Sequence, residues 1–326
     1  MKVVVNTVTF NSSNLLKKTI SALLNQTVDI FKIVITDNNS NAEHKINLKK
    51  LQNEYPDKID IIWLKTNTGG AGGFYESMKY AKENYNPEWY WLMDDDAYPD
   101  DDTLEILIEK SRKLDNIGYI APIIYGIDKN EYQLYHARKQ KGKICKFTSI
   151  ASSIDELHEI EKIDVDAFVG PLISEIAVIE CGLPRAEYFI EGDDTDYTYR
   201  ITRKLNGYLV RNAKINHRDL PPENDINLDG WWKKYYWFRN SILFSKNNLK
   251  GVQKILSILY FYYYAYKYKC VLYKNKELKK YRVFLWSVLK SGLSDGIHGK
   301  TGARLLPLDY KMKLKQWEDN NKGEKN

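Results

Sequence analysis

Three consecutive aspartates, Asp94, Asp95 and Asp96, have the clearest potential for chemistry in this sequence. A short apolar run, 90–93, leads directly into them and is typical of a strand buried on both faces. Adjacent carboxylates repel one another unless a cation neutralises them, and alternate residues of an extended chain point the same way. We therefore expect Asp94 and Asp96 to hold one hard divalent metal ion. The alternative is a solvated acidic turn that caps the following helix.

A second acidic cluster lies downstream, at Asp193, Asp194 and Asp196. Together with the buried strand before the first cluster, it favours a functional site over a solvated turn. The alternative for Asp193 and Asp194 is structural, because either could cap a helix that the pattern predicts over 196–205.

The first 121 residues alternate between strand-like and helix-like patterns. Strands are predicted over 2–8, 31–36, 59–64, 89–93 and 117–121, and helices over 14–25, 42–55, 74–84 and 101–114. Strands that alternate with helices of this length indicate βαβ units. The fold class is therefore α/β, with a mainly parallel sheet flanked by helices.

Polar residues follow each of the first four predicted strands. They are Thr9 and Asn11, then 37–39, 67–73 and 94–96. The carboxyl ends of parallel strands meet at one edge of the sheet, and open α/β sheets bind ligands there. We expect all four segments to face one crevice.

The glycine-rich segment 67–73 would let backbone approach a ligand closely, and it precedes a helix whose N-terminus favours anions. It lacks the position and the spacing of a dinucleotide fingerprint, and the chain contains no P-loop. A hydride-transfer enzyme is therefore not expected. The alternative for this segment is a plain flexible connector.

Later segments are less regular. Residues 122–165 have weak periodicity and predict short strands or loops, whereas 208–210 predicts a strand. Residues 213–217 predict a further strand at the edge of the sheet, ending in His217.

Charge divides the chain near residue 230. Residues 231–326 hold 21 Lys and Arg against 6 Asp and Glu, a net charge of +15, whereas residues 1–230 carry a net charge of −9. We expect an α/β catalytic domain over 1–230 and a helical, basic and aromatic subdomain over 231–326.

Three scattered cysteines suit neither a disulfide framework nor a zinc site, and they fit a reducing cytosol. A strand is predicted from residue 2, so we expect no signal peptide. No run of 18 apolar residues occurs, so we expect no transmembrane helix. The expected location is the cytoplasm.

The basic tail is also rich in aromatic residues, in the clusters 231–239 and 255–264. Such residues suit lipid headgroups and anionic leaflets, so the tail predicts peripheral contact with the inner face of the cell membrane. The alternative is an ordinary helical subdomain that packs its aromatic residues against the first domain. Nucleic acid is not an expected partner, because the first domain is acidic and no recognition motif is present.

Taken together, these motifs resemble those of family 2 glycosyltransferases, which have the GT-A (Rossmann-like) fold. The resemblance extends over about 1–245. Residues 4–11 resemble the opening strand and nucleotide-base loop of the family, and 35–40 resemble its second-strand motif. Residues 94–96 match its metal motif, and 191–197 resemble its catalytic-base motif. Segment 67–74, combined with the three aspartates, most resembles the galactofuranosyltransferase and rhamnosyltransferase branch. Gly192 departs from that branch, whose galactofuranosyl polymerases often have Trp before the Asp pair.

The resemblance implies a role for each site residue. Asp94 and Asp96 would hold Mn²⁺ or Mg²⁺, with His217 as a further ligand unless it is simply a surface histidine. Asp194, or alternatively Asp193, would be the general base of an inverting transfer. The nucleotide and diphosphate of the donor would lie against Thr9, Asn11, Asp37, Asn67, Gly69, Gly70 and Asp95. The alternative for Asp37 is an Asx-turn.

The donor that the resemblance implies is a nucleotide sugar, UDP-galactofuranose in preference to dTDP-rhamnose. The acceptor would be a glycan or lipid-linked oligosaccharide of cell-surface polysaccharide synthesis. A sugar nucleotidyltransferase would instead need a basic, glycine-rich loop after the first strand, and 9–13 contains neither Gly nor Lys. A noncatalytic, membrane-bound glycan-binding module would not need the second aspartate cluster.

Overall fold

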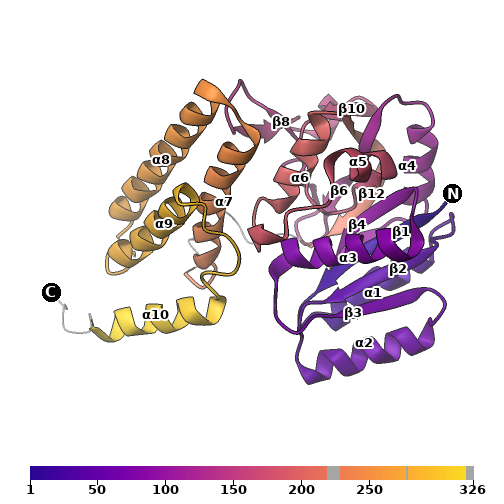
Figure 1. Cartoon of the computed structure of the whole chain (residues 1–326), viewed down its shortest axis with the longest axis horizontal. Helices are drawn as coiled ribbons and strands as arrows, with labels where there is room; N and C mark the ends of the chain where they lie inside the picture. The colour runs from indigo at the N-terminus through magenta and orange to yellow at the C-terminus, as the bar shows by residue number, and fades with distance from the viewer. Residues whose placement is uncertain (219–227, 277, 321–326) are drawn as a thin grey trace. The chain divides into compact units, whose positions relative to one another are not determined.

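The computed structural model describes residues 1–218, 228–276 and 278–320 (Figure 1). The chain divides into two compact units. Unit 1 comprises 1–140, 147–186 and 193–220, and unit 2 comprises 141–146, 187–192 and 221–326. Unit 2 therefore includes two short segments, 141–146 and 187–192, that lie in the sequence between parts of unit 1.

Unit 1 is built on a mixed sheet with the strand order β10-β12-β6-β11-β4-β1-β2-β3. Its strands are β1 (Val3–Thr9), β2 (Lys32–Asp37), β3 (Ile59–Trp63), β4 (Trp89–Asp94), β5 (Ala97–Pro99), β6 (Ile117–Gly126), β7 (Glu131–Tyr132), β10 (Ile160–Ile163), β11 (Leu172–Ser174) and β12 (Asn206–His217). β1 pairs in parallel with β2 and β4, β2 with β3, and β6 with β12. The α/β class with a mainly parallel sheet is thus confirmed.

Helices cover both faces of this sheet. They are α1 (Ser13–Leu24), α2 (Ala42–Glu54), α3 (Gly69–Tyr85), α4 (Thr103–Ser111), α5 (Glu175–Cys181) and α6 (Asp193–Thr202). Successive strand residues point to opposite faces. Val3 and Val5 of β1 accordingly pack in one core with α1, α2 and α4, and Val4 packs in the other with α3, α5 and α6.

Two helices begin earlier than predicted. α3 begins at Gly69 rather than at residue 74, so the glycines form its first turn. Gly73 is needed there, because a Cβ at this position would lie 2.4 Å from Val8 Cγ1 of the adjacent strand. α6 begins at Asp193 rather than at residue 196, so the Asp193–Asp194 pair lies inside its first turn.

The prediction of a separate edge strand over 213–217 was wrong. Residues 206–217 form one strand, β12, whose final part pairs with β6 on one side and with β5 on the other. A register shift between Val210 and Lys214 interrupts the pairing with β6 and divides the sequence pattern.

The region over 122–165 contains only short elements besides the end of β6. They are β7, β8 (Arg138–Gln140), β9 (Phe147–Ser149), the 3-10 helix η1 (Ile154–Glu156) and β10. Strands this short contain too few residues to show a period of two, which explains the weak sequence pattern. A second 3-10 helix, η2 (Ala186–Tyr188), precedes α6.

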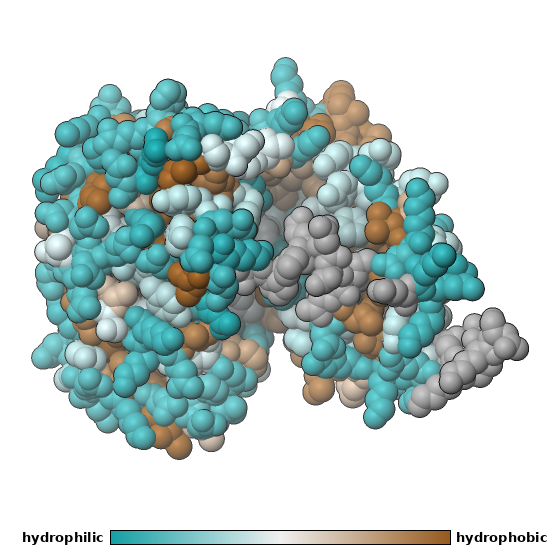
Figure 2. All heavy atoms as spheres, turned by 180° about the vertical axis from the view of Figure 1, so that it is seen from behind, coloured by the Kyte–Doolittle hydropathy of each residue, from teal (hydrophilic) through white to brown (hydrophobic). Residues whose placement is uncertain are grey.

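Unit 2 is helical in its described residues, with α7 (Trp232–Asn248), α8 (Gly251–Lys274), α9 (Arg282–Ile297) and α10 (Pro307–Asn320). Gly292 allows α9 to approach α7 closely, because a Cβ there would lie 2.4 Å from the Tyr235 carbonyl oxygen. Within the described ranges, no helix combines the length and the apolar character that crossing a membrane requires. Apolar side chains do reach the surface of unit 2 on the face drawn in Figure 2.

Candidate active site

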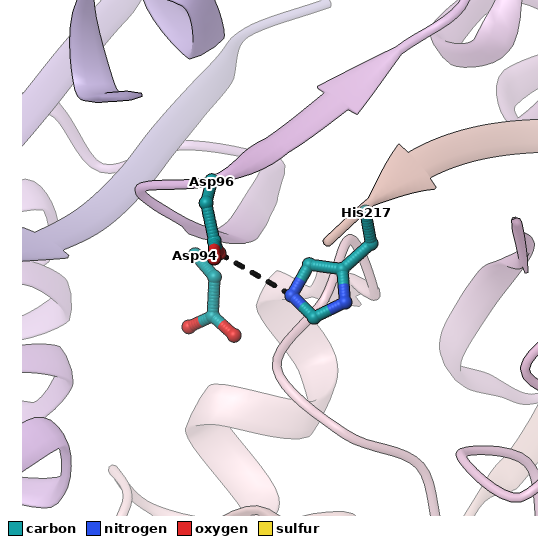
Figure 3. Close-up of side chains that lie close together, drawn as sticks. All are labelled: Asp94, Asp96 and His217. Atoms are coloured by element: carbon teal, nitrogen blue, oxygen red, sulfur yellow. Dashed lines mark ion pairs between the residues drawn. The ribbon is translucent and has the colours of Figure 1, made fainter. Parts of the chain in front are cut away.

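Three predicted metal ligands come together at the carboxyl end of β4. Asp94 is the last residue of β4, Asp96 lies in the turn that follows, and His217 ends β12. One ligand atom from each lies within 4.8 Å of the other two. Figure 3 shows the two aspartates beside the His217 ring, whose Nε2 is 3.3 Å from Asp96 Oδ1. Two carboxylates and one imidazole nitrogen form a donor set that suits Mn²⁺, and also Mg²⁺ if water completes the shell.

Strand pairing explains how His217 reaches the aspartates. The chain turns directly after Asp96 into β5, which runs antiparallel to β12 with Ala97 opposite His217. The pairing of β5 with β12 therefore places the His217 imidazole next to the Asp96 carboxylate, although the two residues are far apart in the sequence.

The electrostatics of this cluster favour a cation. Burial raises the pKa of Asp94 to about 7, with further increases from the charges of Asp96, Asp95 and Asp194 and an opposing effect of His217. Burial likewise raises the pKa of Asp95 to about 7, and the hydrogen bond from Thr9 opposes that change. Crowded, poorly solvated carboxylates repel one another, and a divalent ion would relieve that repulsion.

Two residues that the sequence analysis missed hold the His217 ring. His217 Nδ1 lies 3.1 Å from Gln133 Oε1, and His136 Nε2 lies 2.9 Å from the same oxygen. Gln133 Nε2 donates to the Arg218 carbonyl at 3.3 Å, which fixes Oε1 as the atom facing the rings. Since Oε1 can only accept, His217 donates to it through Nδ1, which leaves Nε2 as the ring nitrogen that faces Asp96. Gln133 and His136 lie in the weakly patterned 122–165 region, where no local signal marks them.

Thr9 is the last residue of β1, and Asn11 lies in the loop that follows it. Thr9 Oγ1 donates to Asp95 Oδ2 at 2.6 Å, so these two predicted donor-binding side chains bind each other. Asn11 has left-handed backbone, with φ of 54°, and its Oδ1 accepts from the Asn41 amide at 2.8 Å. The loops that follow β1 and β2 are thereby joined.

Asp37, at the end of β2, is completely buried. Its two carboxylate oxygens accept from the Ser40 amide at 3.2 and 3.3 Å, and Lys45 Nζ is 4.0 Å away. This is a local bond from side chain to backbone, as the alternative role implied, although an Asx-turn would use the amide two residues on and not the one three residues on. One shared N–H leaves further lone pairs on the carboxylate, so the turn is compatible with base recognition as well.

The glycine-rich segment is held by asparagines. Asn67 Oδ1 accepts from the Gly69 amide at 2.8 Å, and Asn38 Nδ2 donates to the Gly69 carbonyl at 2.9 Å. Gly69 itself has a φ of 72°. Around Gly70, no atom lies within 4 Å of the position of an added Cβ, so this part of the first turn of α3 has open space for a ligand.

The second aspartate cluster divides into two roles. Asp196 is completely buried and forms ion pairs with Arg185 and with Arg200, the latter at 2.9 Å, so it is structural. Asp194 differs, because its charge raises the pKa of Asp94 in the metal cluster and that of the buried Asp166. A carboxylate whose charge acts on the metal cluster is a candidate to take the proton of a bound hydroxyl.

Residues 4–159 match the family model described as Glycosyl transferase family 2. No curated protein was found to match the sequence.

Solved structures share the fold. Residues 1–349 of TarS from S. aureus, in complex with UDP, align with 98% of this chain and 89% of that one, at 14% identity and a TM-score of 0.56. GalNAc-T7, solved with UDP, GalNAc and Mn²⁺, aligns with 78% of this chain at 17% identity and a TM-score of 0.55. The alignment covers 54% of the GalNAc-T7 chain, so this chain spans about half of that structure. Residues 4–159 thus resemble family 2 glycosyltransferases, and these solved structures share the fold of the chain.

Proposed function

We propose that this protein is a metal-dependent, inverting glycosyltransferase that uses a nucleotide-sugar donor. The observation that carries the proposal is the cluster of Asp94, Asp96 and His217 at the carboxyl end of β4, with the charge of Asp194 acting on it. This edge of the sheet is where α/β folds bind ligands.

Asp94, Asp96 and His217 would hold Mn²⁺ or Mg²⁺. The bound ion would neutralise the charge that the diphosphate leaving group gains as the glycosidic bond breaks. Gln133 would keep the His217 ring in the ligating tautomer.

Asp194 is the proposed general base, with Asp193 as the alternative. The Asp194 carboxylate would accept the proton of the acceptor hydroxyl while the hydroxyl oxygen bonds to the anomeric carbon of the donor sugar. The bond from that carbon to the diphosphate breaks on the opposite side, so the nucleoside diphosphate leaves and the configuration inverts. Asp193 is 8% exposed and Asp194 is more accessible, which favours Asp194.

The nucleotide and diphosphate would bind along the loops that follow β1 to β4. Asp37 would accept a hydrogen bond from the base, and the first turn of α3 would face the diphosphate through Gly69 and Gly70. The remaining members of this site would be Thr9, Asn11, Asn67 and Asp95. The open space at Gly70 supports a close approach of ligand to backbone.

UDP-galactofuranose is the favoured donor, and dTDP-rhamnose is the alternative within the same class. The similarity of segment 67–74 to the galactofuranosyltransferase branch supports this choice, as does the UDP in the TarS and GalNAc-T7 structures. The acceptor would be a hydroxyl of a glycan or lipid-linked oligosaccharide in cell-surface polysaccharide synthesis.

Calorimetric titration with UDP and with dTDP, each with and without Mn²⁺, tests the proposed function. We expect metal-dependent binding that Asp96→Ala abolishes, and the preferred nucleotide identifies the donor class. Failure of the wild-type protein to bind either nucleotide in the presence of Mn²⁺ would refute the site.

We further propose that α8 contacts an anionic membrane surface, at the cytoplasmic face. Seven apolar or aromatic side chains repeat along one side of this helix with helical spacing, and all are exposed: Val252, Ile255, Leu256, Leu259, Tyr263, Tyr266 and Tyr273. The opposite side is the buried one, with Phe261, Ala265 and Leu272. An apolar face of this length is typical of interfacial helices.

Charge favours lipid over a second copy of this chain as the partner of α8. Residues 249–276 contain six lysines and no acidic residue, so two copies of the helix would repel each other. Anionic headgroups attract such a segment by about 1 kcal/mol per basic residue near the surface.

Sedimentation with phosphatidylcholine vesicles, with and without phosphatidylglycerol, tests this contact. We expect binding only to the anionic vesicles, with loss of binding in Leu259→Glu and no effect of Ile46→Glu. Ile46 is the matched control, because it is exposed to a similar extent on α2 in unit 1. Equal recovery of the wild-type protein and Leu259→Glu would refute the contact.

A further inference from the structure

The segment that enters α6 has an unusual backbone. Phe189, Glu191 and Gly192 all have positive φ, at 64°, 67° and 85°. Left-handed backbone is unfavourable for residues that carry a Cβ, so the surroundings must hold the first two in place. The segment leads directly into Asp193 and Asp194.

The side chain of Asn240, on α7, forms hydrogen bonds with three backbone carbonyl groups of this segment. The two N–H groups of Asn240 Nδ2 are shared among the carbonyl oxygens of Tyr188 at 3.0 Å, Ile190 at 2.8 Å and Glu191 at 2.6 Å. These atoms belong to unit 2, since 187–192 groups with α7 and not with the sheet. Asn240 is 2% exposed, so water does not compete for these hydrogen bonds.

Arg239 fixes the orientation of that amide. Its Nε donates to Asn240 Oδ1 at 2.9 Å, which leaves Nδ2 facing the segment. Arg239 Nη2 also donates to the Tyr188 carbonyl at 2.7 Å, and the guanidinium lies against the ring of Tyr236. A buried polar network with its groups satisfied is rigid and permits a single arrangement.

We propose that Asn240 is a positioning residue for the transfer reaction. Its amide holds the left-handed segment 188–192 and thereby sets the backbone from which Asp194 is presented as general base. This inference rests on the proposed function. It gives a side chain of α7 a part in the reaction, because Asn240 holds the segment 188–192 that continues directly into α6.

The test compares Asn240→Ala with Asn247→Ala in the full chain. Asn247 is the matched control, because it is the same residue type, on the same helix, and exposed. The measurements are turnover of UDP-galactofuranose and dTDP-rhamnose, followed as release of the nucleoside diphosphate, and the Kd of the released nucleotide with Mn²⁺. Amide hydrogen exchange over 188–192 provides a readout that does not depend on activity.

We expect Asn240→Ala to lower kcat about 10- to 100-fold, because small displacements of a reacting group have effects of this size. The Kd for the nucleotide with Mn²⁺ should stay unchanged, and exchange over 188–192 should accelerate. Gly192→Ala is a second variant with the same expected pattern. Its Cβ would meet nothing closer than Asn240 Cβ at 3.9 Å, so it changes the backbone preference without a clash.

A kcat for Asn240→Ala equal to that of Asn247→Ala would overturn the positioning role and leave the proposed function intact. Parallel losses of kcat and nucleotide affinity in both Asn240→Ala and Gly192→Ala would also overturn it, because they would show a general effect on the fold. A wild-type protein that turns over neither donor would refute the choice of reaction, and the positioning role with it.

Discussion

Replacing Gln133 should weaken metal binding although this residue touches no metal. Gln133 is 2% exposed, and its Oε1 accepts from the rings of both His217 and His136. Leucine has a similar size but cannot accept a hydrogen bond, so Gln133→Leu releases the His217 ring from its fixed tautomer and orientation. Loss of such a partner typically lowers metal affinity 10- to 100-fold, or about 1.4 to 2.7 kcal/mol.

The same change should also lower the free energy of unfolding. It takes the acceptor Oε1 away from the buried His217 ring and from the half-buried His136 ring, and the loss of such a partner costs about 1 to 3 kcal/mol for a fully buried group. The pKa of His136 is lowered to about 3, mainly by burial and further by the charges of His217 and Arg138. The His136 ring therefore stays neutral at neutral pH and cannot offset the lost hydrogen bond by becoming charged.

Electron paramagnetic resonance of free Mn²⁺ gives the affinity directly, without a donor or an acceptor. Gln133→Glu is the informative partner variant, because its carboxylate can still accept from His217 Nδ1 and should keep Mn²⁺ affinity at or above the wild-type value. Gln253→Leu, at an exposed position of α8, is the control. The reasoning fails if Gln133→Leu binds Mn²⁺ as tightly as Gln253→Leu does.

Two further predictions concern Asp166 and the glycines in the first turn of α3. Burial raises the pKa of Asp166 to about 8, above its value in the unfolded chain, so stability from this group is complete below about pH 4 and is lost as pH rises through about 8. Between pH 5 and pH 9 the wild-type protein should therefore lose about 4 kcal/mol more stability than Asp166→Asn, measured by urea unfolding; parallel pH profiles would contradict this. Gly73→Ala should cost about 1 to 3 kcal/mol by forcing Val8 to move, whereas Gly70→Ala, which meets no atom within 4 Å, should keep the melting temperature and lower UDP affinity if the diphosphate approaches there. Unchanged UDP binding in Gly70→Ala would remove this residue from the site.

Much of the sheet was predictable because its signals are local. The apolar run before Asp94 and the alternating segments up to residue 121 are short-range patterns, and they predict β1 to β4, β6 and the helices between them. The position of polar residues directly after these strands then follows from chain order alone. The glycine-rich turn was placed correctly but interpreted as a loop, since helix propensity disfavours glycine and packing against Val8 is not visible locally.

Other parts of the candidate site depend on contacts between distant segments. Asp196 resembles its acidic neighbours in the sequence, and only its burial between two arginines separates it from them. Gln133 and His136 have no periodic or motif signal, and the segment 187–192 is defined by its hydrogen bonds to α7.

The sequence by itself determined which residue types follow which strands, and with them the acidic, glycine-rich edge of the α/β sheet and the basic, aromatic character of the tail. Only the tertiary structure decided that His217 lies next to Asp96 and that Gln133 orients the His217 ring. It likewise decided that Asn240 holds the segment that leads into Asp193 and Asp194. The physical reason is that strand and helix periods are properties of neighbouring residues. The pairing of β5 with β12 and the burial of a polar side chain are instead chosen by the packing of the whole chain.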